Sequence, residues 1–215
     1  MIDHLAAILL LTVVIVPFLA VCLTLLLKPR FTQFLFLLNF AVVAICLLIL
    51  PFVGDIIIEL PFTFLGYTVS FTVSTTSALV AVVTISALFV VWMANTNKDG
   101  DKGSRFPAIL VEISMAAGSV AFFSGQFMVR YIALEIVGLM IAAAAINNRD
   151  FLQGFTEVFL SLRFGDVGLL AAILLLYTAT GTLNIAAMIE TATQLPLQEQ
   201  IRLMAGFLTA ILVKM

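Results

Sequence analysis

The chain has 215 residues, of which 63% are hydrophobic and only 10% are charged, and its formal net charge is −2. Soluble domains are about half apolar and about a quarter charged, so this composition excludes an ordinary soluble enzyme. Apolar runs long enough to cross a bilayer recur, which favours helices over a barrel of short alternating strands. The sequence therefore predicts an all-α integral membrane protein in a lipid bilayer, and no basic patch indicates a nucleic-acid partner.

Two spanning helices are predicted at the start of the chain, over Leu5–Leu27 and Phe34–Val53. No basic residue precedes the first apolar run, which argues for a retained helix rather than a cleaved signal peptide. Pro17 falls inside the first helix, where a membrane helix tolerates it and bends. Polar and apolar residues then partly alternate over Leu60–Ser74 around Gly66, which predicts a short β-hairpin at the membrane surface.

Four more full spans and one shorter helix follow, which makes six full transmembrane helices plus a truncated seventh. Asn95–Arg105 is the most polar stretch and is predicted to be a loop. The last helix has only about 16 residues, too few to span the bilayer comfortably. We expect helices over Thr76–Met93, Pro107–Phe123, Gln126–Ala145 and Phe151–Tyr177, a loop over Thr178–Glu199, and the short helix over Gln200–Met215.

The charges of the connecting loops fall into two groups. Loops after the first, third and fifth helices contain the basic residues, whereas loops after the second, fourth and sixth contain only acidic ones. The positive-inside rule therefore predicts that the odd-numbered loops face the cytoplasm or matrix and that the N-terminus lies outside. The basic residues are Lys28, Arg30, Lys98, Lys102, Arg105 and Arg149, and the acidic ones are Asp55, Glu59, Glu190 and Glu199.

Ionisable residues inside the predicted spans belong only to the last four helices. Such residues are rare in membranes and usually face a bundle interior or an aqueous path. We therefore divide the chain into residues 1–58 (two scaffold helices), residues 59–106 (hairpin, third helix and polar loop) and residues 107–215 (the working helices). The ionisable residues are Glu112, Arg130, Glu135, Glu157, Arg163, Asp166 and Lys214.

Glu135 is the most costly of these charges, because it lies about 13 Å into its helix, near the centre of the hydrocarbon core. Arg163 and Asp166 are three residues apart, so they share a helix face and can pair. Arg130 lies about 140° around the helix from Glu135 and does not face it. Lys214 lies about 20 Å into the last helix and is the natural opposite charge. A buried Glu–Lys pair that opens and closes can exchange protons near neutral pH.

A purely structural interpretation also exists, in which these charges are fixed ion pairs between helices. Glu112 lies near the cytoplasmic end of its helix, and Arg130 can extend toward the outer surface. Cys22 and Cys46 fall inside predicted helices without metal-ligand spacing, and His4 is the only histidine. We therefore predict no metal site, haem, flavin, iron–sulfur cluster or other cofactor.

Three segments resemble the antiporter-like membrane subunits of respiratory complex I, a family shared with Mrp-type sodium/proton antiporters and membrane-bound hydrogenases. Tyr131–Met140 (YIALEIVGLM) is similar to the family's fifth helix around an essential Glu. Arg163–Gly168 (RFGDVG), followed by Thr180–Asn184 (TGTLN), is similar to the sixth helix and its loop. Phe207–Met215 (FLTAILVKM) is similar to the seventh helix, where a Lys precedes a helix break. The likeness is greatest to the N-terminal half of the distal, largest subunit.

This resemblance implies roles for the buried charges. Glu135 and Lys214 take the place of the family's paired proton-handling Glu and Lys, and Arg163 and Asp166 match charges thought to modulate that pair. Glu157 departs from the family, which often has a Lys or another polar residue there. Residues 107–215 then form a first, incomplete antiporter-like repeat, whose inverted second copy another chain or segment supplies.

The resemblance implies a non-redox, proton-translocating subunit of a multisubunit complex such as an NADH-quinone oxidoreductase. Its partners are the other membrane subunits, in a bacterial cytoplasmic membrane or a mitochondrial inner membrane. A subunit of a cation/proton antiporter or of an ion-coupled inorganic-carbon uptake complex is the alternative. A further alternative is a structural half-module that no longer conducts protons.

Overall fold

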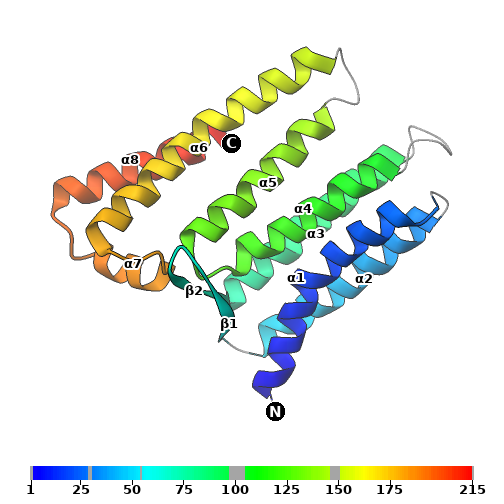
Figure 1. Cartoon of the computed structure of the whole chain (residues 1–215), viewed down its shortest axis with the longest axis horizontal. Coiled ribbons are helices and arrows are strands. Elements are labelled where there is room, and N and C mark those ends of the chain that lie inside the picture. Colours follow the sequence, from blue (N-terminus) through cyan, green and yellow to red (C-terminus); the bar gives the residue numbers. More distant parts are fainter. Residues whose placement is uncertain (1, 29–30, 54, 97–104, 146–150, 215) are drawn as a thin grey trace. The chain divides into compact units, whose positions relative to one another are not determined.

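The computed structural model describes residues 2–28, 31–53, 55–96, 105–145 and 151–214. Six of the helices in these ranges, α1 to α6, are long and apolar enough to cross a membrane. The predicted all-α, multi-pass membrane fold with a short hairpin is therefore confirmed. In chain order (Figure 1), the elements are α1 (Ile2–Leu26), α2 (Thr32–Ile49), the 3₁₀ turn η2 (Leu50–Phe52), β1 (Ile56–Phe64), β2 (Tyr67–Val73), α3 (Thr75–Thr96), α4 (Arg105–Phe123), α5 (Phe127–Ala145), α6 (Phe151–Thr180), α7 (Ile185–Ala192) and α8 (Leu197–Lys214).

The chain forms two compact units, and the first comprises residues 1–58 and 71–123. Its helices α1 to α4 run side by side (Figure 1), and α4 packs against all three of the others. The buried small residues Ala116, Ala117 and Ala121 allow this close approach, as is typical of membrane helices. Phe36 of α2 stacks on Trp92 of α3 with a ring separation of 4.1 Å, so the start of α2 lies beside the end of α3.

The hairpin of β1 and β2 turns at Leu65 and Gly66, as the predicted turn near Gly66 required. Both residues have positive φ, 53° and 81°, which together describe a two-residue turn of type I′. Glycine adopts this conformation freely, whereas a leucine is strained in it.

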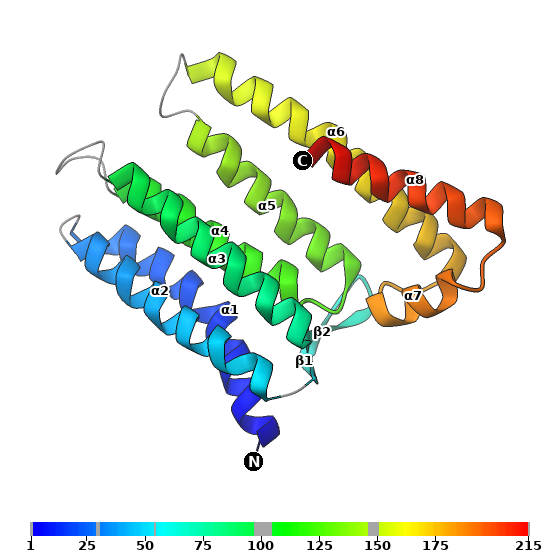
Figure 2. The ribbon, with the colours of Figure 1, turned by 180° about the vertical axis from the view of Figure 1, so that it is seen from behind.

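The second unit comprises residues 59–70 and 124–215, so it contains the hairpin tip and α5 to α8. Helix α6 packs against α5, α7 and α8, and Figure 2 shows α8 lying along α6. Two glycines permit this contact. A Cβ placed on Gly206 would lie 2.9 Å from the Cβ of Ala172, and one on Gly168 would lie 3.2 Å from the carbonyl oxygen of Gly206.

Backbone hydrogen bonds tie the start of α5 to the hairpin tip and to the segment after α6. The Gly125 amide donates to the Ser70 carbonyl at 2.7 Å, and the Phe127 amide donates to the Leu183 carbonyl at 3.0 Å. The side-chain amide of Gln126 donates to a further hairpin carbonyl at 2.6 Å. These bonds hold the start of α5, the helix that contains Glu135, against the hairpin tip and the segment after α6.

The predicted loop over Thr178–Glu199 is wrong in one respect, because it contains the helix α7. Helix α6 continues to Thr180, and α8 begins at Leu197 rather than near Gln200. The side chain of Asn184 accepts a hydrogen bond from the Ala187 amide at 3.2 Å, which caps the start of α7.

Other predictions from the sequence stay open. The predicted polar loop Asn95–Arg105 lies outside the described residues over 97–104, and so do Arg30, Lys98, Lys102 and Arg149. The orientation of the N-terminus and the division of the chain at residues 58 and 106 therefore remain predictions. Arg202, which was not among the predicted charges, is exposed on α8.

Candidate functional site

Arg163 of α6 forms a salt bridge with Glu135 of α5 within the second unit. The atoms in contact are an Arg163 terminal nitrogen and Glu135 Oε2. At about 1.5 Å of rise per residue, Glu135 lies ~15 Å from Ala145 and Arg163 lies ~18 Å from Phe151. The end of α5 and the start of α6 are adjacent in the sequence. Measured from these two ends, the charges lie at similar depth along their helices.

Asp166 places a second carboxylate beside the same guanidinium. Its Oδ2 lies 3.8 Å from the Arg163 nitrogen, as their three-residue spacing indicates. The side chains of Glu135 and Asp166 are 14% and 8% exposed, whereas that of Arg163 is 38% exposed. One cation thus lies between two largely buried carboxylates.

Two aromatic residues border this group. The Arg163 guanidinium carbon lies 4.7 Å from the ring centre of Phe159, a cation–π distance. Tyr131 lies one turn before Glu135 on α5 and interacts electrostatically with both Asp166 and Arg163. Glu135 Oε1 is buried and has no hydrogen-bond partner within the described part of the chain. Glu135 therefore contacts Arg163 through Oε2, whereas Oε1 accepts no hydrogen bond from the described residues.

The other predicted residues of the second unit are Arg130, Glu157 and Lys214. A terminal nitrogen of Arg130 donates to the Ser124 carbonyl at 2.9 Å, so its side chain points back to the start of α5. Glu157 is exposed on α6. Lys214 ends α8, but its side chain lies outside the described residues, so its pairing with Glu135 stays a prediction.

Glu112 belongs to the first unit, where α4 packs against α1, α2 and α3. Its side chain is fully buried. The hydroxyl of Thr24, on α1, donates to Glu112 Oε1 at 3.3 Å. The other carboxyl oxygen has no hydrogen-bond partner among the residues that the structure describes.

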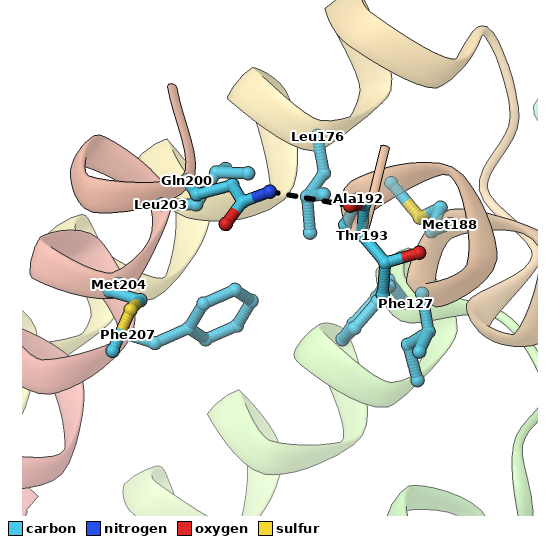
Figure 3. Close-up of a pocket in the computed structure, with 10 residues that line it drawn as sticks. Phe127, Leu176, Met188, Ala192, Thr193, Gln200, Leu203, Met204 and Phe207 are labelled. Carbon is cyan, nitrogen blue, oxygen red and sulfur yellow. Dashed lines mark hydrogen bonds between the residues drawn. The ribbon is translucent and has the colours of Figure 1, made fainter. Parts of the chain in front are cut away.

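An apolar cavity of about 350 Å³ lies in the second unit between the start of α5, the end of α6, α7 and the start of α8 (Figure 3). Phe127, Met188, Met204 and Phe207 contribute to its wall. The side-chain amide of Gln200 donates to backbone carbonyls at 2.8 and 3.3 Å, so it is already engaged. The lining contains no ionisable residue, and the cavity therefore does not extend the charged group.

The contact of Arg163 with Glu135 was not predicted from the sequence, from which Lys214 is expected as the partner of Glu135. The usable sequence signal was depth, because Arg163 lies about as far from the start of α6 as Glu135 lies from the end of α5. Within the described residues, no group of three or more His, Cys, Asp or Glu side chains could hold a metal ion.

Comparisons with known proteins agree with this architecture. Residues 124–215, slightly less than half of the chain, match the family described as "NADH:quinone oxidoreductase/Mrp antiporter, TM". No curated protein sequence matched the chain. The fold is similar to a chain in a solved structure described as the membrane-bound sulfane sulfur reductase (MBS), an archaeal respiratory membrane complex.

That superposition has a TM-score of 0.75 at 18% sequence identity and covers 96% of this chain. It covers only 44% of the matched chain, so this chain spans less than half the length of that relative. At this identity the likeness concerns the fold alone. The resemblance to antiporter-like membrane subunits is thus confirmed over residues 124–215, where the family model matches.

Proposed function

We propose that this chain is an antiporter-like membrane subunit of a multisubunit respiratory complex and that its α5–α6 charges move protons. The observation that carries this proposal is the position of Arg163, whose guanidinium contacts Glu135 on one helix and approaches Asp166 on its own. The family match over residues 124–215 includes all three residues. The fold shared with a chain of an archaeal respiratory complex adds support for the type of assembly.

The proposed chemistry follows from the permanent charge of arginine. Because a guanidinium does not release its proton in proteins, Arg163 can only change its partner. While it contacts Glu135, it stabilises the Glu135 carboxylate. When it turns to Asp166, Glu135 is left in an apolar bilayer without a cation, and it takes up one proton. The return of Arg163 displaces that proton, so each cycle binds one proton and releases one.

Lys214 is proposed as the second cation of this switch, as the resemblance implies. Its pairing with Glu135 when Arg163 has turned away would release the proton toward the next group. A chain or segment that completes the last helix and supplies a second repeat is then the expected partner. Other membrane subunits carry any redox chemistry, so this chain contributes only the transport step.

Of the candidate complexes, we propose an energy-converting complex such as an NADH-quinone oxidoreductase. The family description names Mrp antiporters beside these oxidoreductases, so a subunit of a cation/proton antiporter is the second candidate. An ion-coupled inorganic-carbon uptake complex would use the same charges. The three differ in the driving reaction, which is electron transfer, a sodium gradient or bicarbonate uptake.

The test places the native complex in sealed vesicles and records acidification with a pH-sensitive dye. Electron donors, a sodium gradient and bicarbonate are supplied in turn, with wild type and Glu135→Gln compared under each. The proposal expects one driving reaction to move protons and the variant to lose most of that signal. Glu157→Gln is the matched control, because Glu157 is exposed on the same unit. Unchanged acidification in Glu135→Gln would favour a structural module that conducts no protons.

A further inference from the structure

Glu112 is a buried carboxyl group that takes no part in the proton cycle proposed for α5 and α6. It lies on α4, about 10 Å from the start of that helix, and its side chain is fully buried within the first unit. A fully buried carboxyl group is rarely found without a partner. Its surroundings therefore decide whether it carries a charge.

No cation compensates Glu112 within the described part of the first unit. Neither of the salt bridges among the described residues includes it. Helices α2 and α3 contain no charged residue, and Asp3 and His4 of α1 lie about 30 Å along that helix from Thr24. Lys28 follows the end of α1, one turn beyond Thr24, but its side chain is exposed and it forms no salt bridge with Glu112. Cys22 of α1 and Cys46 of α2 are the remaining ionisable groups on these helices, and α4 itself begins at Arg105, whose side chain lies outside the described residues.

Among the described residues, Thr24 alone donates a hydrogen bond to the Glu112 side chain, and this bond suits a neutral acid better than a carboxylate. Thr24 is itself fully buried, and its hydroxyl donates to Oε1 at the long distance of 3.3 Å. A single neutral donor cannot replace the water that a carboxylate loses on burial. A neutral carboxylic acid needs fewer hydrogen bonds to offset its burial. Oε1 then acts as its carbonyl oxygen, and Oε2 holds the proton.

Further buried polar atoms lie toward the same end of this unit. Thr32 Oγ1, the side-chain amide of Asn39 and Trp92 Nε1 are all buried without hydrogen-bond partners among the described residues. Thr24 lies near the end of α1 and Thr32 begins α2, while Phe36 of α2 stacks on Trp92 near the end of α3. Buried polar atoms left in this way are usually satisfied by internal water.

We propose that Glu112 and Thr24 form a proton-binding site in the first unit. Glu112 holds one proton as a neutral carboxylic acid and exchanges it with water at the end of the unit where α1 leads into α2. Water molecules bound to Asn39, Thr32 and Trp92 form a polar route that carries that proton to and from Glu112, and the three side chains hold this water in place. This site goes beyond the proposed α5–α6 cycle and does not depend on it.

Infrared spectroscopy of the native complex tests the proposal, because a neutral carboxylic acid has a C=O band that shifts in D₂O. The complex is labelled with ¹³C-glutamate, and spectra of wild type, Glu112→Gln, Thr24→Val and Glu157→Gln are compared. We expect a glutamic-acid band in wild type that Glu112→Gln removes and Thr24→Val shifts. Glu157→Gln should leave it unchanged. Bands of other neutral glutamic acids, including Glu135, cancel in the difference spectrum of wild type minus Glu112→Gln. A difference spectrum without a glutamic-acid band would overturn the proposal.

A second measurement does not require the Glu112 variant to assemble. The wild-type band is followed after transfer into D₂O, and Asn39→Leu is compared with it. We expect complete exchange in wild type and at least a tenfold slower exchange in Asn39→Leu, because an apolar side chain interrupts the polar route. Absence of any neutral glutamic-acid band in wild type shows an ionised Glu112 and contradicts the proposal. Equal exchange rates in the two proteins contradict the route.

Discussion

Arg163 on α6 and Glu135 on α5 form the one salt bridge that joins two different helices within the described residues. The other pair, Arg163 with Asp166, lies within α6. The contact therefore has two consequences. It ties α5 to α6 in the second unit, and it makes the state of Glu135 depend on where one guanidinium points.

The first consequence predicts a stability effect. Arg163→Gln leaves Glu135 without its cation and should destabilise the second unit by about 1–3 kcal/mol, which is less than for a fully buried pair because Arg163 is 38% exposed. Removing both charges in Arg163→Gln/Glu135→Gln should recover most of this loss. The readout is the temperature at which the chain leaves the purified complex in detergent. A double variant no better than the single one would show that the contact does not carry this energy.

The close contact of α6 and α8 predicts a second effect. Gly206→Ala should destabilise this contact by about 1–3 kcal/mol, because the new methyl group would lie 2.9 Å from the Cβ of Ala172. Gly138→Ala is the matched control, since its Cβ would meet only the end of the Leu162 side chain at 3.8 Å. Thermal dissociation of the two variants compares them directly, and equal stability would contradict the packing described.

The membrane spans could be predicted from the sequence because they depend on length and composition alone. The turn at Gly66 was also predictable, since few residues adopt positive φ. The partner of Glu135 was not, because the depth and rotation of α5 against α6 depend on packing between helices that no local pattern records. Depth arithmetic pointed to Lys214, whose pairing with Glu135 stays a prediction, and it did not show that the long side chain of Arg163 reaches Glu135 from the neighbouring helix.

Leu65 predicts a stabilising substitution in the hairpin. A leucine at φ 53° costs about 1–2 kcal/mol relative to a residue suited to that conformation. Leu65→Asn should therefore stabilise the hairpin by about 0.5–1 kcal/mol, since Asn-Gly suits a type I′ turn. Gly66→Ala should have the opposite sign, because Gly66 has φ 81°. Hydrogen exchange of the hairpin amides measures both, and slower exchange in Gly66→Ala would be inconsistent with the turn.

Tyr67 predicts a dependence on pH. Its hydroxyl donates to the Gly181 carbonyl at 2.8 Å and lies 3.5 Å from the Tyr177 hydroxyl. The hydrogen bond with Tyr177 raises the pKa of the Tyr67 phenol above 10.0, and burial adds to this. Because the folded form holds the proton more tightly, the contribution of Tyr67 is complete below pH 10 and is lost as the pH rises through the raised pKa.

Titration of the tyrosinate absorbance tests this prediction by difference between wild type and Tyr67→Phe. The component that the variant lacks should titrate above pH 10, and Tyr177→Phe should move it back toward the ordinary value. Over the same pH range, hydrogen exchange at the hairpin tip should quicken in wild type and stay level in Tyr67→Phe. A Tyr67 component at the ordinary value in wild type would refute the contact with Tyr177.

Helix α7 shows where sequence patterns were insufficient. Its eight residues are too few for a clear periodicity, and Gly181 and Pro196 on either side favour a loop. The cap at Asn184, followed by a run of helix-forming residues, was the usable signal. Thr24 was likewise unremarkable in the sequence, because a hydroxyl on a membrane helix usually bonds to its own backbone rather than to a distant carboxyl group.

The central claim is that Arg163 alternates between Glu135 and Asp166, and the most direct test is Asp166→Asn. This variant keeps the contact between Arg163 and Glu135 but removes the charge to which Arg163 turns. The measurement is the number of protons moved per turnover by the intact complex in sealed vesicles, normalised to the amount of this chain. We predict that Asp166→Asn loses most proton movement while the complex remains assembled. Wild-type stoichiometry in that variant would contradict the account.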